Sequence, residues 1–171
     1  MSAIPLLETE RLILRGWNED SDFEPYAAIT ADEQVMRYLG GKPYTPTEAW
    51  RHMAMIVGHW QLRGYSHWAV EEKHGGEFVG RIGFFNPVGW PGFEIGWTLA
   101  RSRWGRGYAL EGARAALAWA RDRLRADHVI SCIHPENRNS IRVAEKLGQK
   151  FEYRTRVLDI PVFVYGINLA G

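Results

Sequence analysis

The sequence predicts a single α/β domain, α+β in class, built around a mixed sheet. Its 171 residues suit one domain, and no linker or repeat divides residues 1–171. The chain is 46% hydrophobic and 24% charged, which is typical of a folded protein with a core and excludes a disordered or collagen-like chain. Hydrophobic residues switch between a period of two and a helical period along the chain. One strand–helix–strand unit lies beyond the middle, which indicates a mixed sheet.

The N-terminal part is expected to hold one strand followed by helices. Thr45 and Glu48 form a capping box with Pro46 at the first helical position, so a helix starts there. Gly64 is the expected end of that helix. The other elements predicted here are a strand at residues 11–15 and short helices at residues 20–29 and 32–38.

Strands dominate the remainder, with two helices between them. Phe93, Ile95 and Trp97 alternate with polar or small residues, which predicts a half-buried strand. Leucines and alanines repeat at helical spacing over residues 107–125 and predict the longest helix of this part. The other elements are strands at 65–72, 77–86, 128–134, 150–158 and 161–168, and a short helix from about 140 to 147.

Charge is divided unevenly along the chain. Residues 1–100 carry 8 basic and 13 acidic side chains, whereas residues 101–171 carry 13 basic and 7 acidic ones. This division suggests that the C-terminal part meets an anion. The alternative is that these side chains belong to solvated helix faces. A net charge of +1 without a basic and aromatic motif argues against a nucleic-acid partner.

Several classes of protein and site are excluded or disfavoured. Cys132 is the single cysteine, so no intramolecular disulfide and no cysteine-based zinc site can form. The histidines are scattered without metal-ligand spacing, so no metal is expected. No apolar run approaches the roughly 20 residues that cross a bilayer, and no secretory signal is visible. We therefore expect no membrane partner and, by default, a cytoplasmic protein.

A glycine-containing turn precedes the longest C-terminal helix. Glycines let the chain turn tightly, and a helix N-terminus offers unpaired N–H donors with a partial positive charge. The turn therefore predicts an anion site, most naturally for phosphate. It is neither a P-loop nor a good dinucleotide fingerprint, because Leu110 stands at the third glycine position. A tight turn with a helix cap is the alternative. The segment reads Trp104-Gly105-Arg106-Gly107-Tyr108-Ala109. Arg101, Arg103 and Arg106 would add charge-assisted contacts to the anion.

This region closely resembles a known family. Residues 97–112 resemble the acetyl-CoA segment of GNAT-superfamily N-acetyltransferases, in particular the branch with the ribosomal-protein N-terminal (alanine or serine) acetyltransferases. Residues 7–15, 93–97 and 137–148 resemble three further segments of that branch, in the expected order. The resemblance implies the GNAT fold: a mixed, mostly antiparallel seven-stranded sheet flanked by four to five helices, in the order β-α-α-β-β-β-α-β-α-β-β.

The resemblance also implies a set of cofactor contacts. In the superfamily pattern Gln/Arg-x-x-Gly-x-Gly/Ala, the last two small residues fall on Gly107 and Ala109, and Trp104 departs from the first position. Backbone N–H groups of the turn would hold the pyrophosphate of acetyl-CoA, and the strand backbone would pair with the pantetheine arm. Asn139 would bind near the pantetheine and Arg142 near a phosphate. The expected cofactor residues are Trp97, Thr98, Leu99, Trp104, Gly105, Arg106, Gly107, Tyr108, Ala109, Leu110, Asn139 and Arg142.

Two residues are expected to carry the catalysis. Glu94 is the candidate base, since acetyl transfer needs a neutral amine and partial burial would raise the pKa of a carboxyl group. Its alternative is an ordinary exposed strand carboxylate. The tyrosine that many members use as the acid is replaced by Ala144. In the branch that this chain resembles, a serine after the asparagine has that role, which implies Ser140 as the candidate acid, with Tyr108 or water still open. Asn139 and Ser140 would also serve as a helix N-cap.

The expected activity is acetyl transfer from acetyl-CoA to a primary amine by direct attack in a ternary complex. A protein N-terminal amine is slightly favoured over a small amine or amino acid. A non-catalytic acyl-CoA sensor or structural module is the alternative, and family dimers make a homodimer an expectation to test. Six acidic side chains of the N-terminal half would suit a cationic acceptor: Glu19, Asp20, Asp22, Glu24, Asp32 and Glu33.

Overall fold

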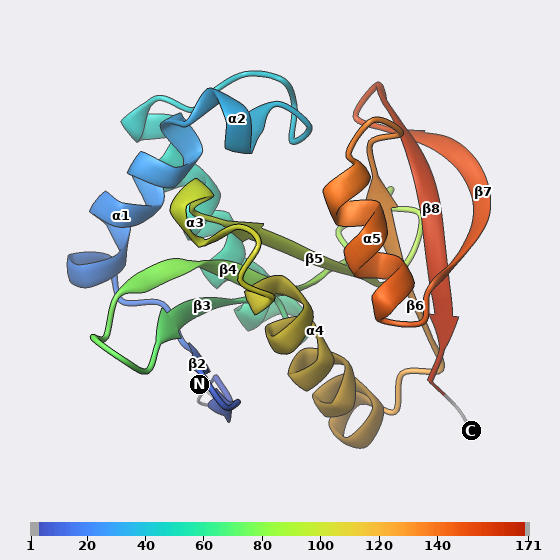
Figure 1. Ribbon diagram of the computed structural model, residues 1–171, viewed down its shortest axis with the longest axis horizontal. Coiled ribbons are helices and arrows are strands. Elements are labelled where there is room, and N and C mark those ends of the chain that lie inside the picture. The colour runs from blue at the N-terminus through green and yellow to red at the C-terminus, as the bar shows by residue number, and fades with distance from the viewer. Residues whose placement is uncertain (1–3, 170–171) are drawn as a thin grey trace.

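The protein folds around one eight-stranded sheet with helices on both faces. The computed structural model describes residues 4–169, and its strands lie in the order β1-β2-β3-β4-β5-β6-β8-β7 (Figure 1). The strands are β1 (Leu7–Glu8), β2 (Leu12–Arg15), β3 (His67–Glu72), β4 (Phe78–Phe85), β5 (Glu94–Leu99), β6 (His128–Ile133), β7 (Lys150–Val157) and β8 (Ile160–Asn168). The helices are α1 (Glu19–Ala31), α2 (Glu33–Met36), α3 (Pro46–Arg63), α4 (Tyr108–Trp119) and α5 (Arg138–Lys146).

The expected mixed, mostly antiparallel sheet is confirmed, with one additional strand and with three helices, instead of the two in the expected order, between β2 and β3. Seven strands match predicted segments, and the eighth, β1, pairs Leu7 with Leu14 of β2. A strand of two residues is too short to give a periodic signal, so the sequence did not show it. The helix expected over 107–125 consists of α4 and a π-helical turn (Ala120–Leu124) that ends at Arg125.

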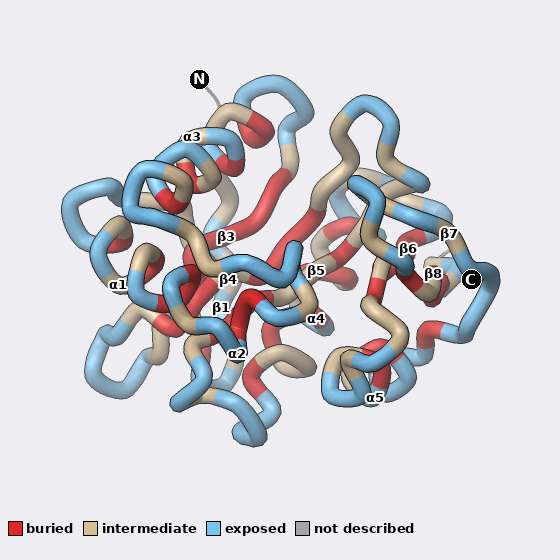
Figure 2. Tube along the Cα trace, turned by 90° about the horizontal axis from the view of Figure 1, so that it is seen from above, coloured by how far each residue is buried: buried red, intermediate tan, exposed pale blue. Residues whose placement is uncertain are grey.

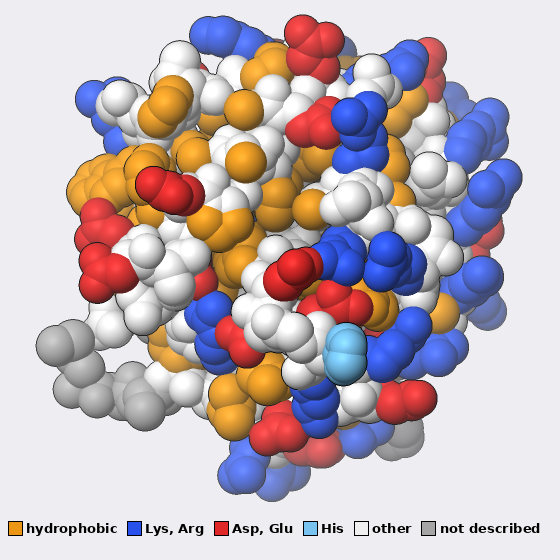
Figure 3. Space-filling model, turned by 60° about the vertical axis from the view of Figure 1, so that its left-hand side comes forward, with side chains coloured by type: hydrophobic (Ala, Val, Ile, Leu, Met, Phe, Trp, Pro, Cys, Tyr) orange, Lys and Arg blue, Asp and Glu red, His pale blue; other side chains and the backbone are white. Residues whose placement is uncertain are grey.

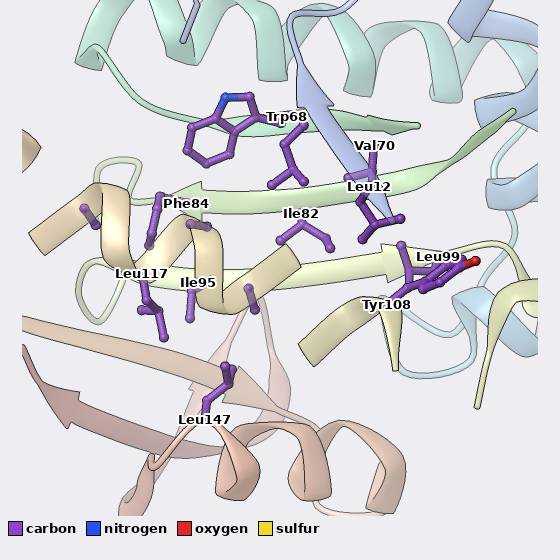
Figure 4. Close-up of a cluster of buried hydrophobic side chains, with 14 of the residues drawn as sticks. Leu12, Trp68, Val70, Ile82, Phe84, Ile95, Leu99, Tyr108, Leu117 and Leu147 are labelled. Atoms are coloured by element: carbon purple, nitrogen blue, oxygen red, sulfur yellow. The ribbon is translucent and has the colours of Figure 1, made fainter. Parts of the chain in front are cut away.

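One face of the sheet forms the core against α4. Buried side chains of β2 to β5 point toward this helix, as Figure 4 shows for Leu12, Trp68, Ile82 and Ile95. Gly112 lets α4 approach closely, because a Cβ there would lie 2.5 Å from Ile82 Cδ1. Strands β3 and β4 are consequently buried along most of their length (Figure 2). The opposite face of β3 to β5 carries polar side chains and is covered by α1 and α3.

The sheet is split between β5 and β6. These parallel strands register at a single pair, Glu94 with Ile130. The hydroxyl of Ser131 donates to Ile95 O at 2.8 Å, and beyond this point the strands diverge. The remainder of β5 therefore has one edge without a strand partner, between the N-terminal ends of α4 and α5. Among residues 4–169, no helix is long and apolar enough to span a membrane.

The carboxylate of Glu111 joins the N-terminal strands to the first turn of α4. Its Oε1 accepts hydrogen bonds from Thr9 Oγ1 at 2.6 Å and Arg11 N at 2.8 Å, and its Oε2 accepts from Arg11 Nε at 2.7 Å. Burial alone would raise the pKa of Glu111, but these hydrogen bonds outweigh it and lower the pKa.

We expect Glu111→Gln to reduce the free energy of unfolding by about 1–2 kcal/mol at pH 7, because charge-assisted hydrogen bonds are lost. A carboxyl group with a lowered pKa stabilises the fold above its unfolded pKa, and this contribution disappears as pH falls through the folded value. In urea unfolding, the difference between the variant and the wild type should be larger at pH 7 than at pH 3. An equal difference at both values would contradict a charge-dependent role.

Candidate active site

A groove of about 570 Å³ lies along the free edge of β5, between the starts of α4 and α5. All predicted cofactor residues except Arg106 line it. Arg106 stands exposed at the tip of the turn, where its carbonyl accepts a hydrogen bond from Arg11 Nη1 at 2.9 Å. The geometry thus brings together segments from β5, the glycine turn and α5, as a cofactor that spans them requires.

The glycine turn leaves backbone donors free at the end of this groove. Gly105 and Gly107 have φ values of +74° and +82°, a left-handed conformation that favours glycine. Gly107 is the N-cap of α4, and no side chain caps this helix. The first N–H groups of α4 therefore remain available to an anion.

Basic side chains around the groove fall into two groups. Arg103 pairs with Glu72 at 2.9 Å and also with Glu77, and Arg101 pairs with Asp32 at 3.0 Å. These pairs neutralise the two arginines that precede the turn. In contrast, three basic residues lining the groove have no carboxylate within 4.0 Å among the described residues: Arg37, Arg142 and Lys146. On the face in Figure 3, Lys and Arg side chains gather along the right-hand edge.

The free edge of β5 offers few hydrogen-bonding groups. The alternation of backbone directions along the strand identifies them. The carbonyl of Ile95 faces β6, where Ser131 binds it, and Leu99 O accepts from Trp104 Nε1 at 3.0 Å. Alternate residues of a strand direct their backbone groups to the same side. Trp97 therefore directs its N–H and C=O into the gap, whereas the backbone of Thr98 faces β4. A pantetheine arm would find its strand-like partner mainly in Trp97.

A second cavity, of about 690 Å³, lies over the polar face of β3 to β5. Helices α1 and α3, the loop after β4 and the β7–β8 hairpin complete its walls. Six residues line both this cavity and the cofactor groove: Tyr38, Leu39, Trp97, Thr98, Asn137 and Ser140. The two spaces therefore meet at the ends of β5 and α5, where two ligands would be in contact. We call the second space the acceptor cavity.

Glu94 projects into the acceptor cavity. It is partly buried, and it accepts hydrogen bonds from Trp90 Nε1 at 2.6 Å and from Cys132 N at 3.1 Å. Burial raises the pKa of Glu94 to about 7, against the opposing effect of these hydrogen bonds and of the charge on Arg81. The alternative of an ordinary exposed carboxylate is therefore wrong. A carboxyl group with this pKa is well suited to accept a proton at neutral pH.

Ser140 lies where the cavities meet. Trp97 Nε1 donates to Ser140 Oγ at 3.3 Å, which leaves the hydroxyl hydrogen free for another acceptor. Neither Ser140 nor Asn139 is the N-cap of α5: that residue is Asn137, whose Oδ1 accepts from Ser140 N at 3.2 Å. The hydroxyl of Tyr108, in contrast, is already engaged, because it donates to Glu72.

Four residues on the polar face could not be assigned to the site from the sequence. Tyr26 and His52 are joined by a hydrogen bond between Tyr26 Oη and His52 Nδ1 at 2.7 Å, and His67 and Arg81 lie on the adjacent strands. Burial, assisted by the charge of Arg81, lowers the pKa of His52 to about 3 and that of His67 well below its usual value. Both histidines are therefore neutral at pH 7.

The expectation of an acidic acceptor site was wrong. Asp22 is buried and pairs with Arg15 at 2.8 Å, and Asp32 pairs with Arg101. None of the six acidic residues named for this role lines the acceptor cavity. Among the described residues that line this cavity, the one carboxylate is that of Glu94. Cys132 also lines this cavity, and burial together with the charge of Glu94 raises the pKa of its thiol. No cluster of His, Cys, Asp and Glu suited to a metal occurs within residues 4–169.

Comparisons with known proteins agree with this geometry. A family model described as an acetyltransferase (GNAT) domain matches residues 11–150. The uncharacterized protein YkkB of Bacillus subtilis is 33% identical over 173 residues, which cover 96% of each chain. A crystal structure of an acetyltransferase from Agrobacterium tumefaciens is 32% identical, with a TM-score of 0.88 over 98% of this chain and 96% of that one. The fold alone is shared with RimL, a ribosomal L7/L12 alpha-N-protein acetyltransferase solved with coenzyme A, at 17% identity and a TM-score of 0.79, covering 96% and 98%.

Proposed function

The chain belongs to the GNAT acetyltransferase family, and from this premise we propose that it acetylates a primary amine by direct attack on acetyl-CoA within one ternary complex. Acetyl-CoA is the acetyl donor of the family. The observation that carries the proposal is the meeting of the cofactor groove and the acceptor cavity at Trp97 and Ser140, with Glu94 in the second of these spaces.

The proposed mechanism assigns proton transfer at the acceptor amine to Glu94 and proton transfer at the departing thiolate to Ser140. Glu94, directly or through water, removes the proton from the acceptor ammonium, because only the neutral amine has a lone pair. The amine nitrogen then bonds to the acetyl carbon, and a backbone N–H of β5 stabilises the negative charge on the carbonyl oxygen. Trp97 offers such a group on the free edge. As the carbon–sulfur bond breaks, Ser140 donates a proton to the departing thiolate and is reprotonated, through water, by the second proton that the nitrogen of the new amide releases.

The acceptor classes are a protein N-terminal amine and a small amine or amino acid. The resemblance to the ribosomal-protein branch supports the first class. The acceptor cavity has a volume typical of sites for small ligands, and it would also hold the first residue of a peptide. The alternative of a non-catalytic CoA sensor is not retained, because the family is one of enzymes and the raised pKa of Glu94 supports its proposed role as a base.

Thiol release from acetyl-CoA, measured against a panel of amines, amino acids and N-terminal peptides, tests this proposal. We expect Ser140→Ala to lower kcat about tenfold without changing the affinity for CoA. The effect is modest for acid catalysis, because a thiol with a pKa near 8.5 already leaves readily as the anion. Ser102→Ala, at an exposed residue outside both cavities, is the matched control. CoA binding without turnover of any acceptor would contradict the proposed function.

A further inference from the structure

Arg81 lies on the floor of the acceptor cavity. It lies in the middle of β4, in register with Ala69 of β3 and Thr98 of β5, so all three share one face of the sheet. The next pair toward Glu94 on that face is Gly83 with Gly96. Small residues thus surround the arginine on the sheet, and the space above them is left open to a ligand.

The guanidinium of Arg81 lacks an anionic partner. Among the residues that the structure describes, no carboxylate lies within 4.0 Å of it, and its Nε is buried without a hydrogen-bond partner. Arg15 in the same sheet provides the comparison, because it pairs with Asp22 and Glu71 at 2.8 Å each. An unpaired, partly buried cation is costly, and such a group calls for an explanation.

The neighbours of Arg81 do not supply the missing charge. His52 and His67 are neutral at pH 7, and burial raises the pKa of Tyr26 above its usual value. The second arginine of the cavity lining, Arg156, adds positive charge from the β7–β8 hairpin. Glu94 lies four residues further along the sheet, since it pairs with Phe85 whereas Thr98 pairs with Arg81. The cavity thus has a cationic end at Arg81 and a proton-accepting end at Glu94.

We propose that Arg81 binds an anionic group of the acceptor, so that the substrate is an amine that also carries a carboxylate or a similar oxyanion. The planar guanidinium would bind a carboxylate through two parallel hydrogen bonds, which also fixes its orientation. With the anion held at Arg81, the amine is directed toward Glu94 and the groove of acetyl-CoA. This inference rests on the proposed function and narrows its acceptor class. Free amino acids and peptides with an acidic first residue both carry such a group.

Matched pairs of acceptors test the inference. Each amino acid is compared with its amide, and a dipeptide amide that begins with Asp is compared with one that begins with Asn. We expect the anionic member of one pair to have a kcat/KM at least tenfold higher, mainly through KM. Arg81→Gln should remove this preference. Arg81→Lys should retain part of it, because lysine keeps the positive charge but cannot form the two parallel hydrogen bonds of a guanidinium. The pair that shows the effect distinguishes a free amino acid from a peptide.

Controls separate this inference from the proposed function. The KM for acetyl-CoA should be the same in Arg81→Gln as in the wild type, and Arg154→Gln, at an exposed arginine that lines neither cavity, should retain the preference. Equal use of both members of every pair, or a preference that survives Arg81→Gln, would overturn the inference while the enzyme remains active. If no amine is acetylated, the proposed function fails. Binding of the same pairs in the presence of CoA, followed by tryptophan fluorescence, then decides the role of Arg81 by itself.

Discussion

Replacing Glu94 by Gln should lower kcat about 10²- to 10³-fold, because general base catalysis contributes an effect of this size. The amide keeps the shape of the side chain but cannot accept a proton at neutral pH. Binding of acetyl-CoA should not change, because Glu94 lines the acceptor cavity and not the cofactor groove. Steady-state kinetics with saturating acceptor, together with the Kd for CoA, measures both quantities.

The pH dependence of kcat in the wild type should report the titration of Glu94. Since burial raises the pKa of Glu94 to about 7, the active carboxylate forms as pH rises through that value. The limb of kcat near pH 7 should therefore be lost in Glu94→Gln. Glu145→Gln, at an exposed residue of α5, is the control and should leave the limb in place. An unaltered limb in Glu94→Gln would assign it to another group, such as the acceptor amine.

Although Glu94→Gln should lower kcat, it should increase the stability of the fold at high pH. A carboxyl group whose pKa is raised on folding stabilises the folded state below its unfolded pKa and loses this contribution as pH rises through 7. Above pH 7 the protein thus carries a partly buried charge that Gln lacks. We expect Glu94→Gln to raise the free energy of unfolding by up to about 3 kcal/mol at pH 8 and to have little effect at pH 4. Urea unfolding at the two values measures this difference.

Gly107→Val should raise the Kd for CoA about 10- to 100-fold with little change in kcat at saturating acetyl-CoA. Gly107 has a φ of +82°, which a β-branched residue adopts only at considerable cost. Relaxation of this strain would turn the first N–H groups of α4 away from the pyrophosphate, and each lost charge-assisted hydrogen bond weakens binding by roughly 1.5–3 kcal/mol. Isothermal titration with CoA gives the Kd directly.

Gly75→Val is the matched control for backbone strain. Gly75 also has a positive φ, +98°, and lies in the β3–β4 turn outside both cavities. It should reduce stability as Gly107→Val does, without changing the Kd for CoA. Unchanged CoA binding in Gly107→Val would mean that the pyrophosphate is held elsewhere.

The sequence predicted those parts of the site that depend on local pattern. The alternation around Glu94 placed its side chain on the face opposite Ile95 and Trp97, and the structure confirms this arrangement. The N-cap of α5 was misplaced by two or three residues, because Asn137, Asn139 and Ser140 are all favourable caps and local pattern does not distinguish them.

The remaining features depend on contacts between distant segments. Arg81 becomes part of the acceptor cavity only through the register of β4 with β3 and β5 and through the packing of α1 and α3 over that face. Arg101 and Arg103 look like phosphate ligands in the sequence. Their carboxylate partners come from residues 32, 72 and 77, and no local pattern reveals this pairing.

The split between β5 and β6 lies beside Glu94, the proposed base. Few bonds cross this boundary, and one of them is the hydrogen bond from Cys132 N to Glu94. Any widening of the boundary would stretch that bond and admit water to the carboxylate, which would shift its basicity toward that of a free glutamate. A cofactor laid along β5 would bridge both halves like a missing strand and damp this movement. Binding of the cofactor in the groove and the pKa of Glu94 would then be coupled across the β5–β6 boundary.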